Sequence, residues 1–123
     1  MIEIDRAYML IALVLACLGM VLGLYMGIAS DKQLQSVHVA LLLPGFVTLA
    51  IYGAVFRLWP GMKKAPLAQA QFWTAAGGSL LLIIGSYFCA TAGSVPLAAL
   101  GSIVFIIASA MIIWQFWMYG DAD

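Results

Sequence analysis

The chain has 123 residues, of which 66% are hydrophobic and 8% are charged, and its mean hydropathy is +1.12. A soluble domain is about half apolar and about a quarter charged, so this composition predicts an integral membrane protein. The formal net charge is zero. That balance excludes the strongly basic surface of a nucleic-acid-binding protein and argues against a polybasic segment that recruits the chain to lipid.

Four apolar segments are long enough to cross a membrane as helices, and they cover residues 8–29, 37–58, 68–90 and 95–119. Short polar or turn-forming stretches separate them, at residues 30–32, 59–64 and 92–94. Pro96 fits the first turn of the last helix. Because such short loops make neighbouring helices antiparallel, we expect one all-α domain over residues 1–123, an up-down-up-down four-helix transmembrane bundle with both termini on one side.

The distribution of lysine and arginine predicts the orientation of this bundle. Four basic residues lie on the side shared by the termini, and only Lys32 lies on the other side; the four are Arg6, Arg57, Lys63 and Lys64. Basic residues accumulate in cytoplasmic loops, so we expect both termini in the cytoplasm and the chain in the bacterial inner membrane. The same bias disfavours a dimer of two oppositely inserted copies.

Glycines form a predicted contact face on the first helix. Gly19, Gly23 and Gly27 are four residues apart and therefore share one groove where another backbone can approach. The partner in that groove could be another helix of the bundle, a second copy of the chain or a different protein. Shorter lines of small residues occur on the third and fourth helices, at Ala70, Thr74 and Gly78 and at Ala98 and Ser102.

Other residues are expected to have structural roles. Pro44 cannot donate a hydrogen bond to the carbonyl of Ala40, so it should kink the second helix and require a donor from a neighbouring helix or a water. Arg57, one residue from the end of that helix, should reach the cytoplasmic head groups. Cys17 and Cys89 are predicted to be buried thiols that fill space in the core.

His38 is the only histidine, and it lies one turn inside the outer end of the second segment. One interpretation is an interfacial histidine bonded to a loop carbonyl or to Asp31. The other is an axial ligand to haem, with Met20, Met26 or His38 of a second subunit as the opposite ligand. A metal site with several protein ligands is excluded, because the predicted spans contain no second histidine, no thiolate cluster and no carboxylate.

Residues 37–47, with the sequence VHVALLLPGFV, continue into Tyr52-Gly53 and into residues 56–60. This stretch resembles the second-helix region of small four-helix proteins similar to part of haem-copper oxidase subunit I. The resemblance implies that His38 ligates haem b near the outer face. Further histidines of such relatives would fall at Ala40 and around Gln71, where this chain has none. Without a copper-binding set of histidines, oxygen reduction at a haem-copper centre is excluded.

Two functions of different classes follow. The first is a haem b-binding, homodimeric electron carrier or redox- or gas-sensing subunit, with His38 as the ligand. The second is a non-catalytic accessory or assembly subunit of a membrane complex, without a cofactor, that acts through its glycine faces. We expect no independent enzymatic activity, because the chain offers no Ser-His-acid or histidine-rich constellation.

Overall fold

The computed structural model describes residues 2–120, and throughout this range the regular elements are helical. Three membrane-length helices are continuous, namely α1 (Ile4–Ala29), α4 (Ala68–Ala92) and α5 (Pro96–Tyr119). The fourth spans Gln35–Leu58 and consists of α2 (Gln35–Ala40), η1 (Leu41–Val47) and α3 (Thr48–Leu58). All four are long and apolar enough to cross a membrane, which confirms the four predicted segments.

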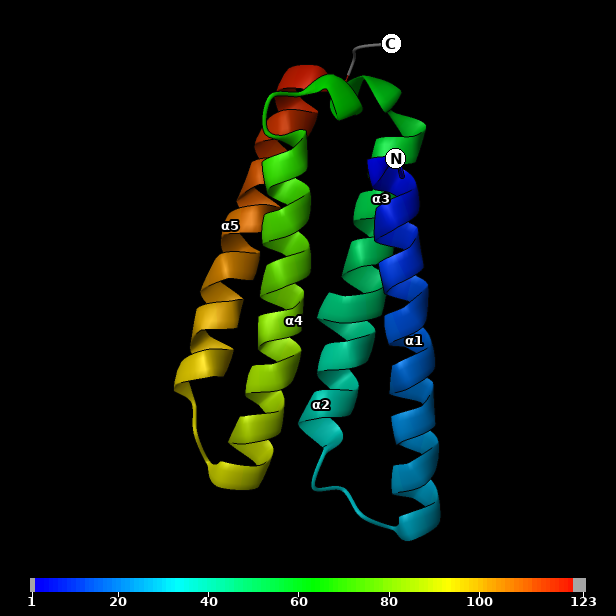
Figure 1. The fold of residues 1–123 in the computed structure, drawn as a ribbon, viewed down its shortest axis with the longest axis vertical. Helices are drawn as coiled ribbons and strands as arrows, with labels where there is room; N and C mark the ends of the chain where they lie inside the picture. Colours follow the sequence, from blue (N-terminus) through cyan, green and yellow to red (C-terminus); the bar gives the residue numbers. More distant parts are fainter. Residues whose placement is uncertain (1, 121–123) are drawn as a thin grey trace.

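The helices run side by side and alternate in direction, so that α1 begins and α5 ends at the same end of the bundle (Figure 1). The short 3-10 helix η2 (Pro60–Lys64) connects α3 to α4 at that end. At the opposite end, α1 stops where Ser30 adopts a left-handed conformation with φ of 51°, and α4 stops at Gly93 with φ of 67°. Pro96 opens α5 as expected.

The bundle is built from two helix hairpins. In the first, α1 packs against η1 and α3, and in the second α4 packs along α5 (Figure 1). The second pair is held so closely that a Cβ atom added to Gly85 would lie 2.3 Å from the backbone nitrogen of Ala98. A Cβ atom at Gly101 would lie 2.5 Å from the backbone nitrogen of Leu82. Glycine therefore sets the approach of α4 to α5, as small residues commonly do between membrane helices.

The second helix changes its hydrogen-bond register around Pro44. Residues Leu41–Val47 form a π-helix, in which each N–H bonds the carbonyl five residues earlier rather than four. This register pairs the carbonyl of Ala40 with the N–H of Gly45 instead of the missing N–H of Pro44. The predicted need for an outside donor to Ala40 is therefore wrong. A neighbouring helix instead supplies a donor one turn later, where Ser79 Oγ bonds the Pro44 carbonyl at 3.2 Å.

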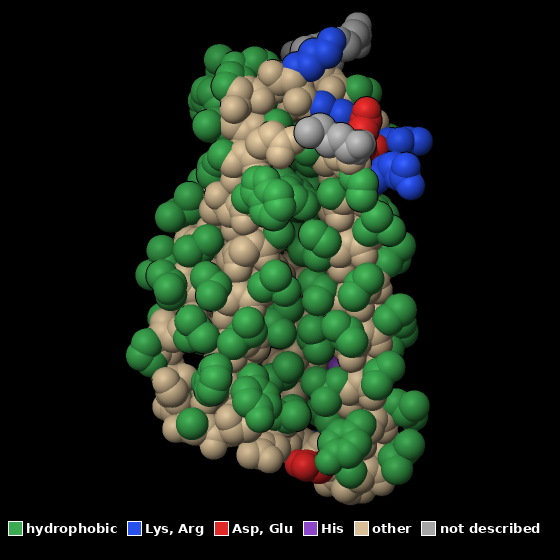
Figure 2. Space-filling view, viewed as in Figure 1, with side chains coloured by type: hydrophobic (Ala, Val, Ile, Leu, Met, Phe, Trp, Pro, Cys, Tyr) green, Lys and Arg blue, Asp and Glu red, His purple; other side chains and the backbone are tan. Residues whose placement is uncertain are grey.

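Apolar side chains cover the long sides of the bundle, and lysine and arginine side chains gather at the end where α1 begins (Figure 2). Cys17 and Cys89 are exposed on these sides, so the prediction that they are buried is wrong. The inward face of α1 is instead formed by Tyr8, Ala12 and Leu15. Both cysteines have free thiols.

Candidate functional site

His38 lies in α2 and is half-buried against α1. Its Nδ1 atom is 2.8 Å from the carbonyl oxygen of Gly19. Because a carbonyl oxygen can only accept, Nδ1 is the donor in this hydrogen bond, and Nε2 takes no part in it. Gly23 provides the space for the ring, since a Cβ atom there would lie 2.7 Å from His38 Cε1. The sequence predicted a loop carbonyl or Asp31 as the partner, but the acceptor is a carbonyl of the first membrane helix.

The glycine face of α1 is therefore used mainly within the bundle. Gly19 packs against Leu41 and Leu42 of η1, and Gly23 packs against His38. Gly27 has open space where its Cβ atom would be. Two of the three predicted contact positions thus join α1 to the second helix, and only Gly27 is open to an outside partner.

The two methionines proposed as haem ligands lie on α1 on either side of Gly23. Met20 is 60% exposed on the outer surface, whereas Met26 is half-buried. The α1 residues shown to meet the imidazole ring are Gly19 and Gly23. Within residues 2–120, no cluster of three or more histidine, cysteine, aspartate or glutamate side chains is arranged to hold a metal ion.

A buried hydrogen-bond network joins three helices in the half of the bundle near the start of α1. The hydroxyl of Tyr8 in α1 donates to Oε1 of Gln71 in α4. Gln71 Nε2 donates in turn to the backbone carbonyl of Ala108 in α5, at 3.2 Å. Tyr8, Gln71 and Ala108 have no exposed surface. A buried amide placed in this way has partners for both its oxygen and its nitrogen, which removes most of the penalty for burying it.

A second polar contact joins the remaining membrane helix to α5, where the hydroxyl groups of Tyr52 in α3 and Ser109 in α5 share a hydrogen bond. Gln115 in α5 is the exception among the buried amides. Its Nε2 donates to the carbonyl of Met111 at 3.2 Å, but no described residue donates to its Oε1. Polar side chains thus connect all four membrane helices through the interior.

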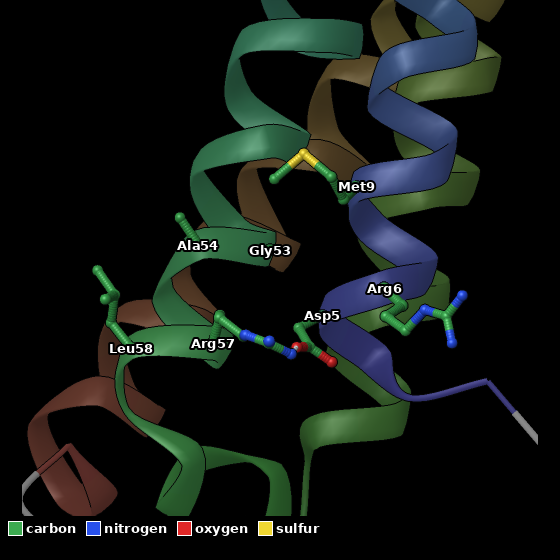
Figure 3. A pocket seen from close by; sticks show the side chains of 7 residues that line it. All are labelled: Asp5, Arg6, Met9, Gly53, Ala54, Arg57 and Leu58. Atoms are coloured by element: carbon green, nitrogen blue, oxygen red, sulfur yellow. Dashed lines mark hydrogen bonds and ion pairs between the residues drawn. The ribbon is translucent and has the colours of Figure 1, made fainter.

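The end of the bundle near the start of α1 carries an ion-pair network that the sequence analysis missed. Asp5 lies in the first turn of α1 and is only 4% exposed. Its carboxylate forms ion pairs with Arg57 Nη1 at 3.1 Å and with Lys63 Nζ at 3.2 Å. Lys63 also pairs with Glu3, and this hydrogen bond, reinforced by Asp5, raises the pKa of the lysine. Arg57 is 73% exposed but bonds Asp5, so it joins α3 to α1 as well as reaching outward (Figure 3).

A signal for Asp5 was present in the sequence. Asp5, Tyr8, Ala12 and Leu15 recur with helical spacing and form the buried face of α1. A predicted helix that began at residue 8 left Asp5 outside this face. Extending the periodicity by one turn would have placed the carboxylate inside it.

Two grooves open on the sides of this same half of the bundle. The larger, of about 490 Å³, lies between α1 and α3 and is lined by Asp5, Arg6, Met9, Gly53, Ala54, Arg57 and Leu58 (Figure 3). The other, of about 400 Å³, lies between α3 and α5 and is almost entirely apolar; its lining residues are Ile51, Tyr52, Val55, Trp59, Ile112, Ile113, Phe116 and Trp117.

No protein-family model, curated protein or solved structure matches the chain.

Proposed function

We propose that the chain is a non-catalytic accessory or assembly subunit of a complex in the bacterial inner membrane, without a resident cofactor. The observation that carries this proposal is that the polar side chains in the interior form hydrogen bonds between the helices. His38 bonds α1, Tyr8 and Gln71 join α1 to α4, and Tyr52 joins α3 to α5. These side chains hold the helices together, so their hydrogen-bonding groups are used within the bundle, with Nε2 of His38 as the exception.

The apolar groove between α3 and α5 is the surface on which we expect a partner to bind. Its lining side chains are aliphatic or aromatic, and the Tyr52 hydroxyl among them is already bonded to Ser109. An apolar groove of this kind suits the side chains of a transmembrane helix, because association in lipid depends on close packing. Trp59 and Phe116 form an edge-to-face pair, with ring centroids 4.8 Å apart, that gives the groove a rigid wall.

The experiment is native electrophoresis of membranes solubilised in digitonin, with the chain detected by a tag. We expect the chain in a complex heavier than its own oligomer and without haem stain. Ile113→Trp, which fills the groove, should release it from that complex. Ile103→Trp is the matched control, because Ile103 is also exposed on α5 but does not line the groove. Migration as a free monomer or dimer in all three cases would contradict the proposal.

Haem b binding by His38 is the second candidate, as an electron carrier or a redox- or gas-sensing subunit. It is favoured by the resemblance of residues 37–60 and by the Nδ1 hydrogen bond to Gly19, which leaves Nε2 able to coordinate iron. His38 would be the residue that holds haem, and haem bound there would supply one-electron or gas-binding chemistry. Met20 is exposed on the outer surface of α1. We therefore favour His38 of a second subunit over Met20 as the second haem ligand.

The visible spectrum of the purified protein, expressed with added haem, separates the two candidates. The accessory subunit is expected to show no Soret band. If the second candidate is correct, wild type has a Soret band that His38→Ala abolishes. One haem per two chains would then indicate paired His38 residues. One haem per chain, with a band altered by Met20→Leu or Met26→Leu, would indicate a methionine ligand.

The orientation proposed for either function places both termini in the cytoplasm. It rests on four basic residues at one end of the bundle, namely Arg6 near the start of α1, Arg57 in the last turn of α3, and Lys63 and Lys64 in η2. Alkaline phosphatase fused to the end of the chain should therefore be inactive, whereas the same enzyme inserted after Asp31 should be active. The reverse pattern would overturn the orientation.

A further inference from the structure

The groove between α1 and α3 combines an apolar floor with two arginines. At Gly53 the two helices are in close contact, since a Cβ atom there would lie 3.0 Å from Tyr8 Cβ and 3.2 Å from the carbonyl oxygen of Asp5. Met9, Ala54 and Leu58 form the apolar part of the lining (Figure 3). The volume of about 490 Å³ is within the range of ~300–1,000 Å³ that is usual for small-molecule sites.

The charge of this groove is positive. Arg6 and Arg57 line it together with Asp5, so the lining carries two guanidinium groups and one carboxylate. Arg57 points toward Asp5, whereas the side chain of Arg6 extends away from both (Figure 3). Asp5 Oδ2 accepts a hydrogen bond from Arg57, and Asp5 Oδ1 is buried without a hydrogen bond of its own and forms an ion pair with Lys63 Nζ at 3.2 Å. Arg57 uses Nη1 for its bond to Asp5 and keeps its other N–H donors. Within residues 2–120, no carboxylate forms an ion pair with Arg6.

The two arginines lie at the same level along the bundle. Arg6 is in the first turns of α1, and Arg57 is in the last turn of α3, close to the end of two membrane-length helices. In a bilayer this is the level of the phosphate groups. The apolar lining at Met9 and Ala54 continues from there toward the hydrocarbon core, because both residues lie further inside their helices than the arginines do.

We propose that this groove binds one anionic phospholipid, with its phosphate at the mouth of the groove and the upper part of an acyl chain along Met9, Ala54 and Leu58. The phosphate meets the free N–H donors of Arg57, and the exposed side chain of Arg6 turns toward it on binding. Guanidinium groups bind phosphate through paired, charge-assisted hydrogen bonds. A zwitterionic lipid gains less, because the carboxylate of Asp5 is buried and out of reach of a choline group. This is a single two-arginine site, distinct from the polybasic segment that the composition argues against.

The test is native mass spectrometry of the purified full chain, titrated with phosphatidylglycerol or with phosphatidylcholine of the same acyl length. We expect one phosphatidylglycerol per chain at concentrations where phosphatidylcholine does not bind. Arg6→Gln should weaken phosphatidylglycerol binding about fivefold, the usual effect of one basic residue at an anionic lipid surface. Ala54→Leu should also weaken it, because the larger side chain fills the apolar part of the groove.

Two matched controls separate this site from general attraction. Lys32→Gln removes a basic residue at the opposite end of the bundle, and Ala99→Leu enlarges an exposed alanine of α5; both should bind phosphatidylglycerol like wild type. Equal binding of the two lipids, or equal effects of Arg6→Gln and Lys32→Gln, would overturn the proposal. Displacement of phosphatidylglycerol by equimolar glycerol 3-phosphate would also overturn it, since the ligand would then be a soluble phosphate.

Discussion

Gly85→Ala is expected to destabilise the bundle more than any other single methyl group added to it. The new Cβ atom would lie 2.3 Å from the backbone nitrogen and 2.5 Å from the Cα atom of Ala98. Backbone cannot rotate aside as a side chain can, so α4 and α5 must separate along the whole contact. Overpacking of a core typically costs ~1–3 kcal/mol, and a contact between two backbones belongs at the upper end of that range.

The measurement is unfolding in mixed micelles with increasing sodium dodecyl sulfate, followed by tryptophan fluorescence. Gly77→Ala is the control, because it makes the same change in the same helix where nothing lies within 4 Å of the new atom. It should unfold like wild type. If both variants unfolded at the same detergent ratio, the close approach of α4 to α5 would not contribute to stability.

The length and the pattern of hydropathy were sufficient to predict the four helices and their alternation. Three helix ends were also readable, from the turn at Ser30, the glycine at Gly93 and the proline at Pro96. These features depend only on local sequence and on the length needed to cross a membrane. The tightest helix contact, through Gly85 and Gly101, was not predicted, because it depends on which faces of α4 and α5 meet.

The features of the candidate site were predicted less well, for two physical reasons. Asp5 was missed because a carboxylate marks the end of an apolar segment, although here its charge is compensated by Arg57 and Lys63. The π-helix at Pro44 was missed because a missing donor can be replaced either from outside or by a change of register. In both cases the energetic penalty was anticipated correctly, for a buried carboxylate and for a backbone carbonyl without its donor. The sequence does not specify which ion pairs or which helical register remove that penalty.

His38 shows why a single residue in a sequence supports two functions. An imidazole inside a membrane helix needs a partner for its N–H group, and the carbonyl of Gly19 provides one at 2.8 Å. The same hydrogen bond would orient a metal-ligating histidine. The hydrogen bond therefore explains how the helix accommodates His38, and the visible spectrum tests whether His38 also binds haem iron.

Gln71→Leu is expected to be the most damaging change to the interior hydrogen bonds. It keeps much of the side-chain volume but removes the donor to the Ala108 carbonyl and the side-chain acceptor of the Tyr8 hydroxyl. The hydroxyl then keeps only the long contact of 3.4 Å to the backbone carbonyl of residue 71. Leaving buried polar groups unpaired costs ~1–3 kcal/mol. Tyr8→Phe alone should cost less, because it leaves only Oε1 of Gln71 without its partner. Unfolding in sodium dodecyl sulfate measures both variants.

The double variant Tyr8→Phe, Gln71→Leu gives the decisive comparison, because it removes both members of the Tyr8–Gln71 pair. Hydrogen bonds between membrane helices average ~0.6 kcal/mol in such cycles and reach ~1.7 kcal/mol. With both side chains fully buried, we expect a coupling in the upper part of this range. Thr74→Val is the control, since Thr74 Oγ1 bonds only the Ala70 carbonyl of its own helix. Additive losses in the cycle would mean that the Tyr8–Gln71 bond does not hold α1 against α4, and the assignment of the interior polar groups to structure would lose its main support.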